Sequence, residues 1–209
     1  MSGRSWQRPG GAEWQAWFRF LLVFYAGFFP AYFLPPLLAG PDAFVPAFAW
    51  ELAMPRLEWA VLAYLSIVPA FLVPLFLMTA DDIRRLGPAS VLCSAIAALF
   101  FLFLPTRMGY PNDQGTEGTL VDLIRAIDVQ GNLFPSLHVA FGTLIVIACA
   151  RRATRRIQAA LFTWLFAMSI STLLTHQHHV VDLAGGALLG VASWLLCRPA
   201  QTSPQPGKD

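Results

Sequence analysis

The chain has 209 residues, of which 56% are hydrophobic and only 12% are charged. Soluble domains carry about 25% charged residues, so this composition argues against a soluble protein and favours a membrane protein. The net charge is only +2, and no basic stripe with interleaved aromatic residues occurs, so nothing indicates a nucleic-acid partner.

Long apolar runs dominate the sequence, and each is close to the length that crosses a bilayer. They cover residues 16–38, 58–80, 87–105, 135–150, 157–175 and 180–197. The pattern predicts an all-α integral membrane protein, a bundle of six transmembrane helices. The length fits one transmembrane domain over residues 1–198, and the polar tail 199–209 is expected to be disordered.

Arginine is distributed unequally between the two sets of connections, and this predicts the orientation. One set is rich in basic residues and the other is poor, so the positive-inside rule puts both termini in the cytoplasm. The outward-facing segments are then those near 39–57, 106–134 and 176–179. The rich set contains Arg4, Arg8, Arg84, Arg85, Arg151, Arg152, Arg155, Arg156, Arg198 and Lys208, and the poor set contains Arg56, Arg107 and Arg125.

Two outward segments allow two interpretations each. The segment 39–57 is unusually apolar, so it either lies in the membrane interface or packs on the bundle as an ordinary hydrophobic loop. The segment 106–134 is polar, and it is either a lid over a site or a solvated connection.

With this orientation, all four histidines fall on the outer face. His138 opens the fourth apolar run, whereas His176, His178 and His179 lie in "THQHHVVD", between the fifth and sixth runs. Arg107, at the end of the third run, falls on the same face. Ionisable residues at the mouth of a membrane bundle are by default a functional site.

His178 and Asp182 are four residues apart, and they share a helix face if the sixth helix begins that early. Gly186 and Gly190 continue that face, where small residues let another helix approach. If Asp182 accepts the Nδ1 proton of His178, Nε2 becomes a nucleophile or base. A structural hydrogen bond at a helix start explains the same spacing equally well.

The "PSLH" stretch has a similar ambiguity. Pro135 suits the first turn of a helix, and the amides of Ser136, Leu137 and His138 would then form an anion site with the Ser136 hydroxyl. The alternative is that Ser136 only caps the helix and His138 packs as an amphipathic residue.

Together, these motifs resemble the second and third signatures of the type-2 phosphatidic acid phosphatase superfamily. Pro135, Ser136 and His138 match its P-S-G-H pattern, whereas Ser171, His178 and Asp182 match the third signature with its internal spacing. The order of the motifs and the six-helix layout also match, from about the third helix onward.

The resemblance implies phosphoryl transfer without a metal or other cofactor. His178 would attack phosphorus, Asp182 would orient it, and His138 would protonate the leaving oxygen. The expected substrate contacts are Arg107, Ser136, Leu137, Ser171, His176 and His179. The resemblance also predicts a multi-pass protein of a bacterial inner membrane whose site faces the periplasm or exterior, a lipid phosphate substrate, and no obligate protein partner.

Three departures from the family patterns bear on the substrate. Leu137 replaces a glycine, Thr172 replaces an arginine, and the first signature is absent, which leaves Arg107 as the best substitute for its basic residue. The leucine and "T-H-Q-H" are similar to the branch of the inositol phosphorylceramide synthases, which transfer a phospho-head group between lipids. Hydrolysis and transfer therefore both stay open.

Two other classes of function compete with a lipid phosphatase or phosphotransferase. Histidines and an aspartate could bind zinc, although neither HExxH nor paired cysteines occur. A non-catalytic carrier or scaffold with the same fold is the third possibility.

Overall fold

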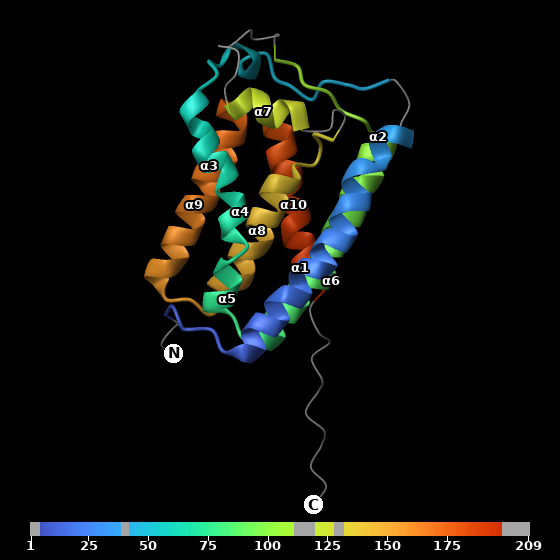
Figure 1. Ribbon diagram of the computed structural model, residues 1–209. Coiled ribbons are helices and arrows are strands. Elements are labelled where there is room, and N and C mark those ends of the chain that lie inside the picture. The colour runs from blue at the N-terminus through green and yellow to red at the C-terminus, as the bar shows by residue number, and fades with distance from the viewer. Residues whose placement is uncertain (1–4, 39–41, 111–119, 128–131, 198–209) are drawn as a thin grey trace, which may run out of the picture.

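The computed structural model describes residues 5–38, 42–110, 120–127 and 132–197 (Figure 1). These residues are helical apart from loops and one isolated β-bridge between Phe44 and Thr106. The helices are α1 (Gly11–Phe33), α2 (Pro35–Leu38), η1 (Glu51–Ala53), η2 (Glu58–Ala60), α3 (Val61–Leu65), α4 (Ile67–Ala70), α5 (Val73–Leu77), α6 (Ala80–Phe103), α7 (Leu120–Ile127), α8 (Leu137–Ala150), α9 (Arg155–Leu174) and α10 (Val180–Leu196).

The helices pass back and forth through one bundle, and α7 lies across one end of it (Figure 1). The passes are α1–α2, η2–α5, α6, α8, α9 and α10, which follow the order of the six predicted runs. Three helical spans, Gly11–Leu38, Ala80–Phe103 and Arg155–Leu174, are long and apolar enough to cross a membrane, whereas the other passes contain shorter apolar helices. The predicted tail 199–209 lies outside the described residues.

The third pass begins earlier than predicted, at Ala80 rather than near residue 87. Thr79 caps it, because its Oγ1 accepts from the Asp82 amide at 3.3 Å, and Pro88 is accommodated inside the helix. The second pass is instead divided into α3, α4 and α5. Pro69 and Pro74 lie in this pass, and a proline lacks the amide that would bond the preceding turn.

Helices α8 and α10 approach closely through the predicted small-residue face. A Cβ on Gly186 would lie 2.4 Å from the Ser136 carbonyl oxygen, and a Cβ on Gly190 would lie 2.4 Å from that of Ala140. Neither position has room for a side chain, so glycine is what permits this contact. The expectation that these glycines let a neighbouring helix approach is confirmed.

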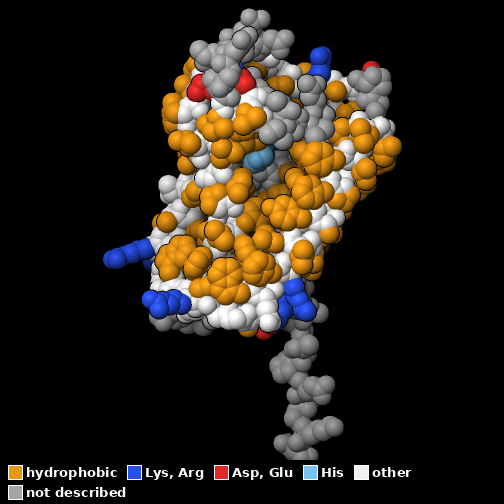
Figure 2. Space-filling view, viewed as in Figure 1, with side chains coloured by type: hydrophobic (Ala, Val, Ile, Leu, Met, Phe, Trp, Pro, Cys, Tyr) orange, Lys and Arg blue, Asp and Glu red, His pale blue; other side chains and the backbone are white. Residues whose placement is uncertain are grey.

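The surface has the distribution expected for a membrane bundle. Apolar side chains cover the middle of the visible face, and charged side chains gather toward its two ends (Figure 2). The described residues nearest to the two termini lie at the same end, opposite α7 (Figure 1).

Candidate functional site

Main-chain hydrogen bonds bring the two histidine motifs together beneath the α7 end. The Ser136 amide donates to the Asp182 carbonyl at 3.0 Å. The Thr106 hydroxyl accepts from the amides of Leu133 and Phe134, at 3.2 and 3.0 Å, which fixes the segment that enters α8. The site is thus built from three chain segments, one of which follows α6.

Ser136 is the N-cap of α8, and its Oγ accepts from the Val139 amide at 3.4 Å. Pro135 therefore precedes the cap and does not lie in the first helical turn as predicted. The amide of Ser136 is already bonded to Asp182, so it is not one of the expected unpaired donors. An α-helix leaves its first amides without intrahelical acceptors, so those of Leu137 and His138 remain the donors by which this helix start could hold an anion.

His178 and Asp182 meet, although not on a shared helix face. Helix α10 begins at Val180 with His179 as its N-cap, so His178 lies before the helix. Its Nδ1 is 3.5 Å from Asp182 Oδ2, and Asp182 is fully buried. The same oxygen accepts from the His179 amide at 2.7 Å, which fixes the carboxylate. The carboxylate thus lies beside Nδ1 of His178.

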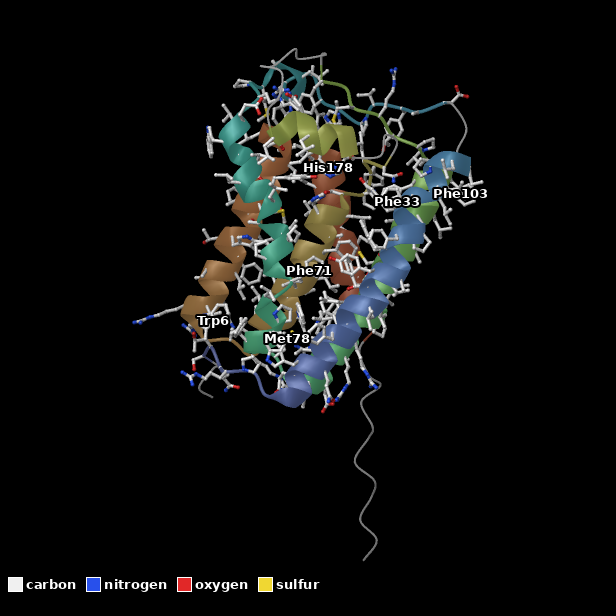
Figure 3. The ribbon with its side chains drawn as sticks, viewed as in Figure 1. Trp6, Phe33, Phe71, Met78, Phe103 and His178 are labelled. Carbon is white, nitrogen blue, oxygen red and sulfur yellow. The ribbon has the colours of Figure 1, made fainter. Side chains whose placement is uncertain are left out.

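His138 lies opposite His178, and their ring centroids are 6.0 Å apart. The His138 ring also packs on Tyr64 of α3 at 4.3 Å. It is half-buried, whereas the other three histidines are buried. Figure 2 shows a histidine side chain at the floor of a hollow between apolar side chains, and Figure 3 shows His178 beneath α7. The histidine side chains therefore lie next to an opening between apolar side chains.

The two remaining histidines form a stack with Tyr110. The Tyr110 ring lies 3.9 Å from that of His176 and 4.7 Å from that of His179, and its hydroxyl donates to the His178 carbonyl at 3.1 Å. Burial, with the charges of Glu51 and Asp182, raises the pKa of Tyr110. The stack therefore fixes the main chain on both sides of His178.

Both ring nitrogens of His179 have partners inside the protein. The Gly109 amide donates to Nε2 at 3.1 Å, and Nδ1 lies 3.1 Å from Glu51 Oε2. His176 Nε2 lies 3.0 Å from the Met54 carbonyl oxygen. Glu51 was not among the predicted site residues, and the one signal for it was that it is one of two acids within an apolar outer segment.

Ser171 and Thr172 face their own helix. The Ser171 hydroxyl donates to the Met168 carbonyl at 2.6 Å, and that of Thr172 donates to the Ser169 carbonyl at 2.7 Å. The Thr172 carbonyl accepts from the His178 amide at 3.2 Å, so this position shapes the turn through its main chain. Leu137 is buried in the core.

Arg107 is exposed, on the loop that also carries Gly109 and Tyr110. Its main chain is held by the Arg107 amide, which donates to the Phe44 carbonyl at 2.9 Å. A second arginine on this end, Arg56, has a buried side chain that forms ion pairs with Glu58 and Asp122.

Residues 107–203 match the family model described as the PAP2 superfamily. The chain is similar to the PAP2 superfamily over this region. The matched region begins at Arg107 and contains both histidine motifs, "PSLH" and "THQHHVVD". Neither a curated protein nor a solved structure matches the chain.

Similarity to the PAP2 superfamily supports a phosphatase-type or phosphotransferase-type enzyme in a membrane. The match does not distinguish the inositol phosphorylceramide synthase-like branch from the others. For the zinc hypothesis, the described part of the chain has no group of three or more histidine, cysteine or acidic side chains placed to hold a metal ion.

Proposed function

We propose that this protein is a PAP2-type lipid phosphatase that cleaves a lipid phosphate at the outer membrane face through a phosphohistidine. One observation carries the proposal. The rings of His138 and His178 lie edge to face with centroids 6.0 Å apart, and the buried Asp182 carboxylate lies 3.5 Å from Nδ1 of His178. Attack needs about 3–3.5 Å between reacting atoms and a general acid needs about 2.6–3.2 Å, so a phosphoryl group that borders the edges of both rings could reach a nitrogen of each.

In the first step, the Nε2 lone pair of His178 attacks phosphorus and the bond to the leaving oxygen breaks. His138 gives its proton to that oxygen, so the lipid alcohol leaves neutral. The His178 ring keeps its Nδ1 proton and becomes cationic, and Asp182 stabilises that charge. Water then attacks phosphorus, His138 takes a proton from it, and the P–N bond returns its electrons to His178.

An amphiphilic substrate accounts for the location of the site. A histidine side chain lies in a hollow flanked by apolar side chains, so a head group could meet the histidines while its chains stay in lipid (Figure 2). We extend the proposal to a single multi-pass domain over residues 1–198, with both termini cytoplasmic and the α7 end facing the periplasm or exterior. Basic residues clustered at the opposite end support that orientation.

The proposed substrate contacts are the first amides of α8, the Ser136 hydroxyl and Arg107. His176 and His179 do not join them, because ring nitrogens of both contact other parts of the protein.

A lipid phosphotransferase is the second candidate, and Leu137 and Thr172 favour it. The usual arginine of the third signature is replaced by a buried threonine bonded to its own helix. A phosphodiester carries less charge than a phosphomonoester, so it needs fewer cations. In this reaction a lipid alcohol replaces water in the second step.

Product analysis on detergent-purified protein separates these candidates. Phosphatidic acid, a polyprenyl diphosphate and a phospholipid diester are each offered with and without ceramide or diacylglycerol, in excess chelator. Free phosphate that disappears with His178→Ala supports the phosphatase, and a new phospholipid formed only with acceptor supports the transferase. No product from any substrate, in protein that stays folded, would contradict both and favour the scaffold.

A further inference from the structure

Glu51 contributes a carboxylate from the first outer segment to the start of α10. Its side chain is fully buried. Its Oε2 accepts from the Val180 amide at 3.2 Å and lies 3.1 Å from Nδ1 of His179. The N-terminal end of a helix carries a partial positive charge, so an anion is stabilised there.

The hydrogen bonds determine the tautomer of His179. The Gly109 amide can only donate, so Nε2, which lies 3.1 Å from it, must carry the lone pair. The ring proton is therefore on Nδ1, and it is donated to Glu51. A neutral ring thus joins the loop after α6 to the first outer segment.

His179 also connects two buried carboxylates. Its ring contacts Glu51, while its main-chain amide donates to Asp182 Oδ2 at 2.7 Å. Because His178 is the preceding residue, any shift of this cap changes the 3.5 Å separation between His178 Nδ1 and Asp182.

We propose that Glu51 is a positioning residue for the reaction. It fixes the ring of His179 and the first turn of α10, and through them the geometry of His178 and Asp182. The inference rests on the proposed function, because it assumes that His178 is the nucleophile. Glu51 Oε1 is buried and has no hydrogen-bond partner among the described residues. One accepting oxygen, such as that of an amide, would satisfy both donors, yet the side chain is a carboxylate. A charged acceptor makes stronger hydrogen bonds than a neutral one, which explains a carboxylate here.

The test compares Glu51→Gln and Glu51→Ala with Glu58→Gln, whose glutamate begins η2 directly after this outer segment and pairs with Arg56. We expect kcat to fall about tenfold in Glu51→Gln and about 100-fold in Glu51→Ala, with KM within about threefold of the parent. Glu58→Gln should be close to the parent. Equal kcat in Glu51→Gln and Glu58→Gln, or a loss confined to KM, would overturn the proposal.

A second measurement is independent of activity. In protein labelled with ¹⁵N-histidine, the ring of His179 should have a protonated Nδ1 and an accepting Nε2, and His179→Asn identifies its signals by their loss. Glu51→Ala should move its Nδ1 signal, whereas Glu58→Gln should not. If the parent protein turns over no lipid phosphate, the proposed function fails while this signal still reports on Glu51. An unchanged Nδ1 signal in Glu51→Ala would overturn the positioning role.

Discussion

The amide of Ser136 donates to the carbonyl oxygen of Asp182 across 3.0 Å, so the two histidine motifs are joined through their main chains. The residues are 46 positions apart in the numbering and lie on different helices. Substituting either side chain leaves this bond in place. The relative position of His138 and His178 therefore depends on how closely α8 approaches α10.

Gly186 is the position most sensitive to that approach. We expect Gly186→Ala to lower the free energy of unfolding by about 1–3 kcal/mol, because the new Cβ would lie 2.4 Å from the Ser136 carbonyl oxygen, and a main-chain atom cannot rotate away. Activity should fall as well, since the displaced Ser136 carries His138 with it. The measurement is thermal unfolding in detergent together with kcat. The matched control is Gly11→Ala, where nothing lies within 4 Å, and equal melting temperatures for the two variants would contradict the prediction.

Tyr110 gives a prediction about pH. Burial and the nearby charges of Glu51 and Asp182 raise its pKa, so above pH about 10 the unfolded chain ionises this tyrosine while the folded protein does not. The stabilisation of the folded protein that comes from the neutral, buried tyrosine is complete below pH about 10 and is lost as pH rises above it.

Tyr110→Phe removes this titration and the hydrogen bond to the His178 carbonyl. At pH 7 the parent should be more stable than Tyr110→Phe by about 0.5–1.5 kcal/mol, and the difference should shrink as pH rises past 10. The readout is the melting temperature of both proteins across this range. A constant difference would show that Tyr110 does not titrate differently in the folded protein.

Tyr64 should affect catalysis through the ring on which His138 packs, 4.3 Å away. Stacked aromatic pairs contribute about 0.5–1.5 kcal/mol, so Tyr64→Leu should lower kcat by roughly two- to tenfold as His138 loses its orientation. Tyr64→Phe keeps the ring and serves as the control. The measurement is the steady-state kcat of both variants. A larger loss of kcat in Tyr64→Phe than in Tyr64→Leu would mean that the hydroxyl, rather than the ring, supports the site.

The sequence predicted the order of the helices and the pairs of residues that meet, because apolar runs and motif spacings are local patterns. It did not predict that His178 and Asp182 meet across a helix cap, because this depends on His179 being bonded to Glu51, 128 positions away. The division of η2–α5 was also missed, since proline in a membrane helix permits either a kink or a break.

Arg107 is the remaining cation to test, because Thr172 leaves no arginine in the third signature. A charge-assisted contact to phosphate contributes about 1.5–3 kcal/mol, so Arg107→Ala should lower turnover by one to two orders of magnitude or more. The exposed side chain stands on the loop whose Tyr110 bonds the His178 carbonyl, which is compatible with reaching a substrate above the rings. Arg84→Ala is the control, since Arg84 pairs with Asp81 at the opposite end of the bundle. Near-parent turnover in Arg107→Ala would remove Arg107 from the site and direct the search to Arg56, whose buried side chain lies on the same end.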